Sequence, residues 1–223
     1  METSSAFGIA HLWQHGDPIT RATALFLLSL SILTWSILAL RGIVWWRERK
    51  SPGILARFCA LGVSAGRQEE WARMPASIRA IWAVQTGPVG PQGTPEAAAS
   101  QRRSRLLAFA LRKVRRELEM GLTVLASIAS TAPFIGLFGT VWAIYHALIT
   151  IGSTGQTSLP AIAGPVGEAL IMTAAGIAVA VPAALGYNLF LRFARRLGGD
   201  LAHFAAEIDG QNTPVAAAVA EQQ

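Results

Sequence analysis

The sequence predicts an all-α, polytopic membrane protein with three transmembrane helices, two of which extend into a cytoplasmic helical region. Hydrophobic residues make up 52% of the 223 residues and charged residues only 14%, which is less charge than a soluble domain of this size normally carries. The apolar segments 22–40, 123–149 and 169–190 are each long enough to cross about 30 Å of hydrocarbon, which takes about 20 helical residues. Basic residues gather beside these segments, as they do at membrane surfaces.

The distribution of lysine and arginine predicts the orientation of the three spans. One basic residue precedes the first span, fifteen lie from Arg41 to Arg116, none lie from Glu117 to Phe190, and three follow. The first span lacks a small-residue cleavage site, so we interpret it as a retained anchor. The positive-inside rule then places segments 1–21 and 150–168 outside and segments 41–122 and 191–223 in the cytoplasm. Basic residues this close to the membrane favour anionic lipids as partners, and we expect no nucleic acid.

The cytoplasmic region is predicted to contain two helical parts joined by a linker. Segment 86–95 has three prolines and three glycines in ten positions, a density that breaks helices and strands. After it, no proline occurs before Pro133, so a single helix is predicted from residue 98 to 151. The amphipathic run 192–208 would complete a helical bundle, and 210–223 reads as a tail. Before the linker, the residues expected to pack are Leu55, Phe58, Cys59, Leu61, Trp71, Ile78, Ile81 and Trp82.

Glu168 is the most informative residue because it lies in the most apolar part of the chain. No other aspartate, glutamate, lysine or arginine occurs between Glu119 and Arg192. A charged side chain at mid-bilayer costs roughly 2.5–3.5 kcal/mol, so such a residue usually faces a bundle interior, a partner or a water-filled pathway. This favours an ion-handling membrane protein. The structural alternative is a glutamate that only pairs with a polar group of a partner to hold an assembly together.

Hydroxyl and small residues mark faces of the second and third spans. Thr123, Ser127 and Thr131 lie at i, i+4 and i+8 and form one stripe, whereas Thr140 points to about the opposite side. Hydroxyls in such helices often bond the carbonyl one turn earlier, which needs no ion role. Small residues allow helix backbones to approach closely in lipid, and those expected to do so are Gly136, Gly139, Gly176, Ala180 and Ala184.

The sequence gives little support to metal binding or catalysis, and we expect neither a cofactor nor an enzyme. Cys59 is the single cysteine, which excludes an internal disulfide and a thiolate cluster. Only His11 and His15 have the helical spacing of a zinc site, without a carboxylate-rich partner motif. An intramembrane serine protease would need a histidine base in the third span, and an aspartyl protease an intramembrane aspartate; the sequence has neither.

Three segments carry a resemblance to the MotA/TolQ/ExbB proton-channel family. They are TAPFIGLFGTVWAI at 131–144, GPVGEALIMT at 164–173 and VPAALGYN at 181–188. The N-terminal WQHGD at 13–17, with Thr34 and Trp35, resembles the ExbB branch in particular. The TolQ branch, a subunit of the Tol-Pal envelope system, remains an alternative, as does a passive membrane scaffold. The flagellar-stator branch of the family has a four-span architecture, whereas this sequence predicts three spans.

The resemblance implies a function, partners and site residues. It implies a multi-pass protein of the bacterial inner membrane, with a periplasmic N-terminus and a cytoplasmic C-terminus. It implies a homopentamer around an ExbD-like single-span subunit that delivers work to a TonB-like energy transducer, driven by the proton motive force. Position by position, Glu168 matches the pore-facing glutamate, and Thr140 and Thr173 match threonines of the same proton pathway. Glu168 and Thr173 lie about 140° apart on an ideal helix, so they share a pathway only on a broad face or a distorted helix.

Overall fold

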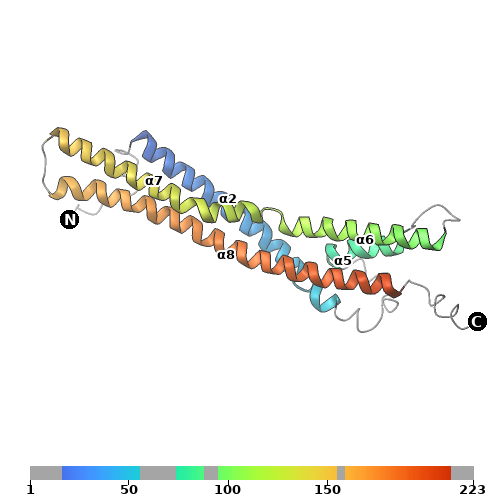
Figure 1. The fold of residues 1–223 in the computed structure, drawn as a ribbon. Coiled ribbons are helices and arrows are strands. Elements are labelled where there is room, and N and C mark those ends of the chain that lie inside the picture. Colours follow the sequence, from blue (N-terminus) through green and yellow to red (C-terminus); the bar gives the residue numbers. More distant parts are fainter. Residues whose placement is uncertain (1–16, 56–73, 88–94, 155–158, 212–223) are drawn as a thin grey trace, which may run out of the picture. The chain divides into compact units, whose positions relative to one another are not determined.

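The computed structural model describes residues 17–55, 74–87, 95–154 and 159–211, and this part of the chain is helical without strands. The predicted all-α class is therefore confirmed (Figure 1). The labelled helices are α2 (Pro18–Glu48), α5 (Ala76–Thr86), α6 (Glu96–Glu119), α7 (Leu122–Thr154) and α8 (Leu159–Gln211).

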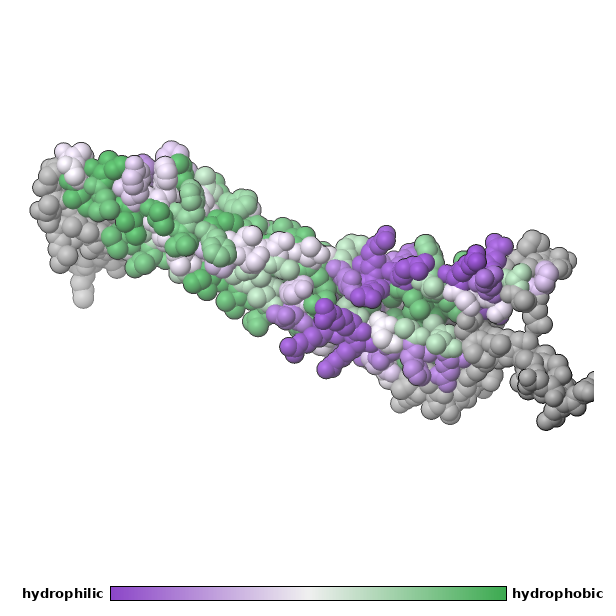
Figure 2. Space-filling view, viewed as in Figure 1, coloured by the Kyte–Doolittle hydropathy of each residue, from purple (hydrophilic) through white to green (hydrophobic). Residues whose placement is uncertain are grey.

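Three helical stretches contain a segment long and apolar enough to cross a membrane, as predicted: Pro18–Leu55, Ala98–Ser153, which includes the turn between α6 and α7, and Ala169–Glu207. Their apolar segments keep large side chains on the outside, such as Trp35, Phe134 and Leu185, which are 61%, 70% and 67% exposed. Figure 2 shows hydrophobic side chains gathered over one portion of the surface and hydrophilic ones over another. A continuous apolar surface of this kind is unfavourable in water and typical of contact with lipid or with another membrane helix.

The chain divides into two compact units, and the first comprises residues up to Leu40 together with Gly121–Leu189. In this unit, α2, α7 and α8 pack through small and hydroxyl residues. Thr23 of α2 and Met172 of α8 both approach Gly139 of α7: a Cβ on this glycine would lie 3.2 Å and 3.1 Å from their side chains. Such packing is typical of membrane helices, where close backbone approach replaces the hydrophobic effect as the stabilising factor.

The second unit comprises Arg41–Met120 and the chain from Phe190 onward. Its core is a hydrophobic cluster supplied by α5, α6 and the last part of α8, together with Leu55 and Met74. Leu55, Ile78 and Ile81 are buried in it, and Trp82 packs against it, as the sequence predicted. Phe58, Cys59, Leu61 and Trp71 lie outside the described residues. The amphipathic run 192–208 contributes Ala194, Leu197, Leu201, Phe204 and Ala205 to the cluster.

The prediction of one unbroken helix from residue 98 to 151 is wrong. Helix α6 ends at Glu119 and α7 begins at Leu122. Between them Gly121 adopts a left-handed conformation, with φ of 79°, which glycine takes at no steric cost and which interrupts a right-handed helix. The predicted helix rested on the absence of proline before Pro133. A glycine in an otherwise helical pattern is a weaker signal of a break than a proline, so the break at Gly121 was not predicted.

Arg41 of α2 binds the end of α6 within the second unit. One guanidinium nitrogen, Nη1, donates to the backbone carbonyl oxygens of Glu117 at 2.7 Å and Leu118 at 3.2 Å. The last carbonyls of a helix lack partners within the helix and carry partial negative charge. The arginine satisfies two of them and thereby fixes α2 to α6 within the second unit.

Candidate functional site

Helices α7 and α8 approach closely at a pair of glycines, Gly136 and Gly176. A Cβ added to Gly136 would lie 2.7 Å from the carbonyl oxygen of Met172 and 3.1 Å from the Cα of Gly176. A Cβ on Gly176 would lie 2.7 Å from the carbonyl oxygen of Ala132. No side chain fits at either position without moving backbone, so the two glycines set the distance between the helices.

One turn along from this crossing, the hydroxyls of Thr140 and Thr173 meet. Thr140 is 6% exposed, and its Oγ1 donates to the carbonyl oxygen of Leu137 at 2.6 Å. The Oγ1 of Thr173 lies 3.5 Å from the Oγ1 of Thr140, at the limit of a hydrogen bond. The structure thus brings together, across two helices, two of the three residues that the sequence singled out.

Glu168 lies on α8, five residues before Thr173. Its side chain falls outside the described residues. The neighbouring Ala169 is completely buried, whereas Leu170 is 63% exposed.

The other hydroxyls of α7 behave as ordinary helix residues. The Oγ of Ser127 donates to the carbonyl oxygen of Thr123 at 3.0 Å. Thr131 Oγ1 donates to the carbonyl oxygen of Ser127 at 2.8 Å. All three side chains are exposed, on a different side of α7 from the buried Thr140. Back-bonding satisfies the hydroxyls of Ser127 and Thr131, so they need no ion role.

Sequence reasoning missed the contribution of α2. Thr20, Thr23 and Thr34 are buried on this helix, with exposures of 6%, 7% and 1%. The hydroxyl of Thr23 bonds the carbonyl oxygen of Ile19 at 2.8 Å, but Thr34 Oγ1 has no hydrogen-bond partner in the described part of the chain. With Leu27, these residues follow a helical spacing of three, four and seven. That spacing places them on one face and is the signal that could have identified it.

Asp17 and His146 form a polar contact at the start of α2. The Nε2 of His146 lies 3.6 Å from an Asp17 carboxylate oxygen. The imidazole packs on the Trp142 ring, with centroids 4.7 Å apart. The described residues contain no group of three or more metal-ligating side chains. His11 and His15, the one histidine pair with the helical spacing of a zinc site, lie outside the described residues.

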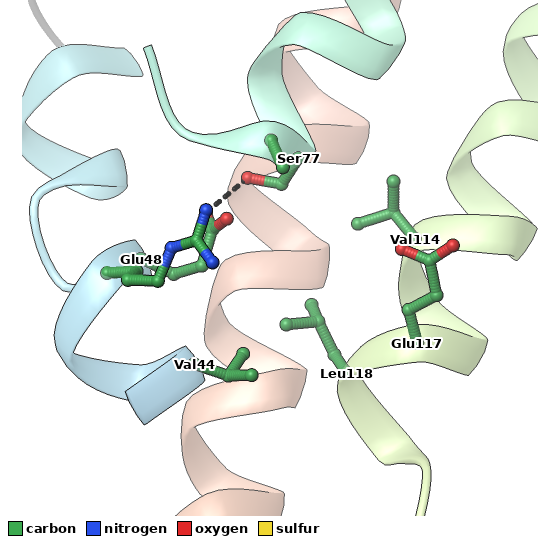
Figure 3. Close-up of a pocket in the computed structure, with 8 residues that line it drawn as sticks. Val44, Glu48, Ser77, Val114, Glu117 and Leu118 are labelled. Carbon is green, nitrogen blue, oxygen red and sulfur yellow. Dashed lines mark hydrogen bonds between the residues drawn. The ribbon is translucent and has the colours of Figure 1, made fainter. Parts of the chain in front are cut away.

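In the second unit, Glu48 is a buried carboxylate within an otherwise basic stretch of sequence, between Arg47 and Arg49. It is 7% exposed, and its Oε2 accepts hydrogen bonds from the hydroxyls of Ser51 at 2.8 Å and Ser77 at 2.5 Å. Figure 3 shows Glu48 and Ser77 beside a cavity of about 180 Å³, with Glu117 on the α6 side. The two serines lie on different segments, so Glu48 ties the end of α2 to α5.

Comparison with known proteins identifies the family of this chain. Residues 89–202, which include Thr140, Glu168 and Thr173, match the MotA/TolQ/ExbB proton channel family. The chain is also 40% identical over 205 residues to a biopolymer transport protein ExbB of Neisseria meningitidis serogroup B (strain ATCC BAA-335 / MC58), covering 88% of this chain and 93% of the relative. The chain belongs to the MotA/TolQ/ExbB proton channel family.

Further relatives of this proton channel family carry the same printed name. A biopolymer transport protein ExbB of Salmonella typhimurium is 28% identical over 202 residues, covering 88% of this chain and 83% of the relative. One of Xanthomonas campestris (strain B100) is 56% identical over 86 residues, which are 39% of this chain and 34% of the relative. Family membership and the three long apolar helices support a multi-pass protein of the inner membrane.

Proposed function

We propose that this chain is the proton-channel subunit of an ExbB–ExbD-type motor that uses the proton motive force to energise TonB-dependent outer-membrane transport. The observation that carries the proposal is Glu168, the only charged residue between Glu119 and Arg192. It lies on the helix that also brings Thr173 to Thr140. Membership of a proton channel family supports the proton as the ion that is conducted. The similarity to ExbB relatives supports the ExbB branch of the family over the TolQ branch.

In this proposal Glu168 takes up and releases the proton, and the threonine hydroxyls assist it. A hydroxyl both donates and accepts hydrogen bonds. Thr140 and Thr173 can therefore form part of a hydrogen-bonded chain at the α7–α8 crossing without carrying charge themselves. An aspartate on the single span of an ExbD-like partner would exchange protons with Glu168. A change in protonation then alters the charge between the helices and biases rotation of the central partner helices.

The proposed assembly is a homopentamer in the inner membrane, with the N-terminus in the periplasm and the C-terminus in the cytoplasm. The pentamer surrounds the ExbD-like helices, which deliver work to a TonB-like transducer. The large exposed side chains of α7 and α8, such as Phe134 and Leu185, offer apolar surface for neighbouring subunits and lipid. Anionic lipids would neutralise the basic residues beside the spans.

The experiment is proton-driven uptake of a TonB-dependent substrate in cells that carry Glu168→Gln, with assembly measured by native mass spectrometry. Glutamine keeps the size of the side chain but carries no titratable proton. We expect uptake to be lost while the complex assembles normally. Asp200→Asn is the matched control, since it removes an exposed carboxylate from the same helix and should leave uptake unchanged.

The other outcomes separate the alternatives. Full uptake with Glu168→Gln would contradict the proposal and leave the glutamate structural. If Glu168→Gln abolishes both uptake and assembly, Glu168 holds the complex together by pairing with a partner. Normal uptake combined with a defective cell envelope would point to a TolQ-type subunit of the Tol-Pal system, and no effect on either process would point to a passive scaffold.

A further inference from the structure

A groove between α6 and α8 in the second unit plays no part in the proposed proton pathway. It encloses about 380 Å³. Gly198 and Gly199 form part of its wall, and a Cβ on either glycine would meet no atom within 4 Å. The helix backbone is therefore uncovered there and leaves room for a ligand. Three arginines line the same groove, two from α6 and one from α8: Arg112, Arg115 and Arg195.

The groove carries positive charge that the described residues do not neutralise. Arg115 bonds Glu119 across one helical turn, with its Nε 2.9 Å from the carboxylate. Arg112 and Arg195 are exposed and form no ion pair with any described residue. Two unpaired guanidinium groups, on helices that face each other across an open groove, are suited to bind one anion together. The guanidinium fork fits the oxygens of a phosphate with two parallel hydrogen bonds.

The position of Arg195 along α8 selects the source of that anion. Arg195 follows the end of the third apolar segment by five residues, within the continuous helix α8. At about 1.5 Å per helical residue this distance is about 7 Å. Arginine side chains can reach back toward the membrane along their alkyl stems. The Arg195 guanidinium is then at the depth of the lipid headgroups, which lie outside about 30 Å of hydrocarbon, and Arg112 faces it across the groove.

We propose that this groove binds the phosphate headgroup of one anionic glycerophospholipid, held by Arg112 and Arg195 over the uncovered backbone of Gly198 and Gly199. The acyl chains would extend from the headgroup into the hydrocarbon of the bilayer. The site would tie α6 to α8 and so fix the cytoplasmic bundle to the membrane. The proposal requires only that the chain is embedded in a membrane, so it stands or falls separately from the proton pathway.

The test is native mass spectrometry of the full-length chain in neutral detergent, titrated with phosphatidylglycerol and, separately, with phosphatidylcholine. We expect one phosphatidylglycerol to be retained at concentrations at which phosphatidylcholine is not. Arg112→Gln with Arg195→Gln should weaken this binding about twenty-fivefold, at roughly fivefold for each arginine. Gly198→Leu should weaken it as well without changing the charge, because leucine fills the groove.

Matched neighbours supply the control. Arg116→Gln with Arg196→Gln removes the same charge from the same two helices, at exposed positions that do not line the groove. This pair should keep binding within about twofold at 0.15 M salt, where exposed charges outside the groove are screened. Circular dichroism would verify that each variant is folded.

Three results would overturn the proposal. The first is an equal loss in both arginine pairs, which would indicate diffuse surface charge. The second is unchanged lipid binding in both Gly198→Leu and the groove pair. The third is binding of glycerol phosphate, which has no acyl chains, as tightly as phosphatidylglycerol, which would indicate a site for a soluble anion. Substrate uptake by the Glu168→Gln variant has no bearing on any of them.

Discussion

At the scale of single residues, burial separates hydroxyls that look alike in the sequence. Thr131 and Thr140 lie on the same helix, and both bond a carbonyl of the preceding turn. Only Thr140 is buried, and only Thr140 meets a hydroxyl of another helix. A residue on the proposed pathway should therefore respond to loss of its hydroxyl, whereas an exposed back-bonded one should not.

Thr140→Val tests this difference, because valine keeps the shape of threonine and removes the hydroxyl. We expect proton-driven uptake to fall about tenfold, the equivalent of about 1.4 kcal/mol, similar to the net value of one hydrogen bond. Thr140→Ser should retain most of the activity. Thr131→Val is the control and should behave as the parent chain. Equal uptake in the Thr140 and Thr131 variants would remove Thr140 from the pathway.

Glu48 gives a second prediction at this scale, for stability rather than transport. Glu48→Ala leaves the hydroxyls of Ser51 and Ser77 without their acceptor, at a cost of about 1–3 kcal/mol in the free energy of unfolding. Glu48→Gln keeps an acceptor oxygen and should cost less. Glu119→Ala breaks only the exposed ion pair with Arg115, worth about 0–1 kcal/mol. Thermal unfolding in detergent, followed by circular dichroism, should give melting temperatures that rise from Glu48→Ala through Glu48→Gln to Glu119→Ala. A Glu48→Ala variant as stable as Glu119→Ala would contradict the stabilising role of Glu48.

At the scale of helices, the α7–α8 crossing depends on glycine. In Gly136→Ala the new methyl group would lie 2.7 Å from the Met172 carbonyl oxygen. The helices must then separate, at a cost of about 1–3 kcal/mol, typical of overpacking. Gly152→Ala on the same helix adds its methyl to open space and should be neutral or stabilising, since alanine favours helix. A melting temperature that falls no further in Gly136→Ala than in Gly152→Ala would contradict the role of this crossing.

Much of the helical architecture was predictable because long apolar runs and amphipathic spacing report directly on helices. The apolar segments, the packing of 192–208 and the close approach at Gly136 and Gly176 all followed from residue type and period. The break at Gly121 was not predictable in the same way, because glycine is tolerated within helices and only the backbone shows its left-handed conformation. Nor did the sequence show that Glu48, which lies in a basic stretch, would be buried and would accept hydrogen bonds from two serines.

At the scale of the whole molecule, the candidate site has two parts. The contact between Thr140 and Thr173 comes from the structure, and Glu168 comes from the sequence. The meeting of Thr140 and Thr173 depends on the distance between two helices, which helical periodicity within each one does not give. Glu168 was identifiable from sequence alone, because a lone charge among apolar residues is costly unless it has a use. The proposed function joins the two in one proton pathway.

Proton flux through the assembled complex tests that pathway most directly. Complexes of this chain with its ExbD-like partner would be reconstituted in liposomes that contain a pH-sensitive dye, and an imposed proton gradient would drive the flux. We predict that Glu168→Gln abolishes the flux while Asp200→Asn leaves it at the level of the parent chain. A Glu168→Gln complex that conducts protons as fast as the parent would contradict the assignment of Glu168 to the pathway.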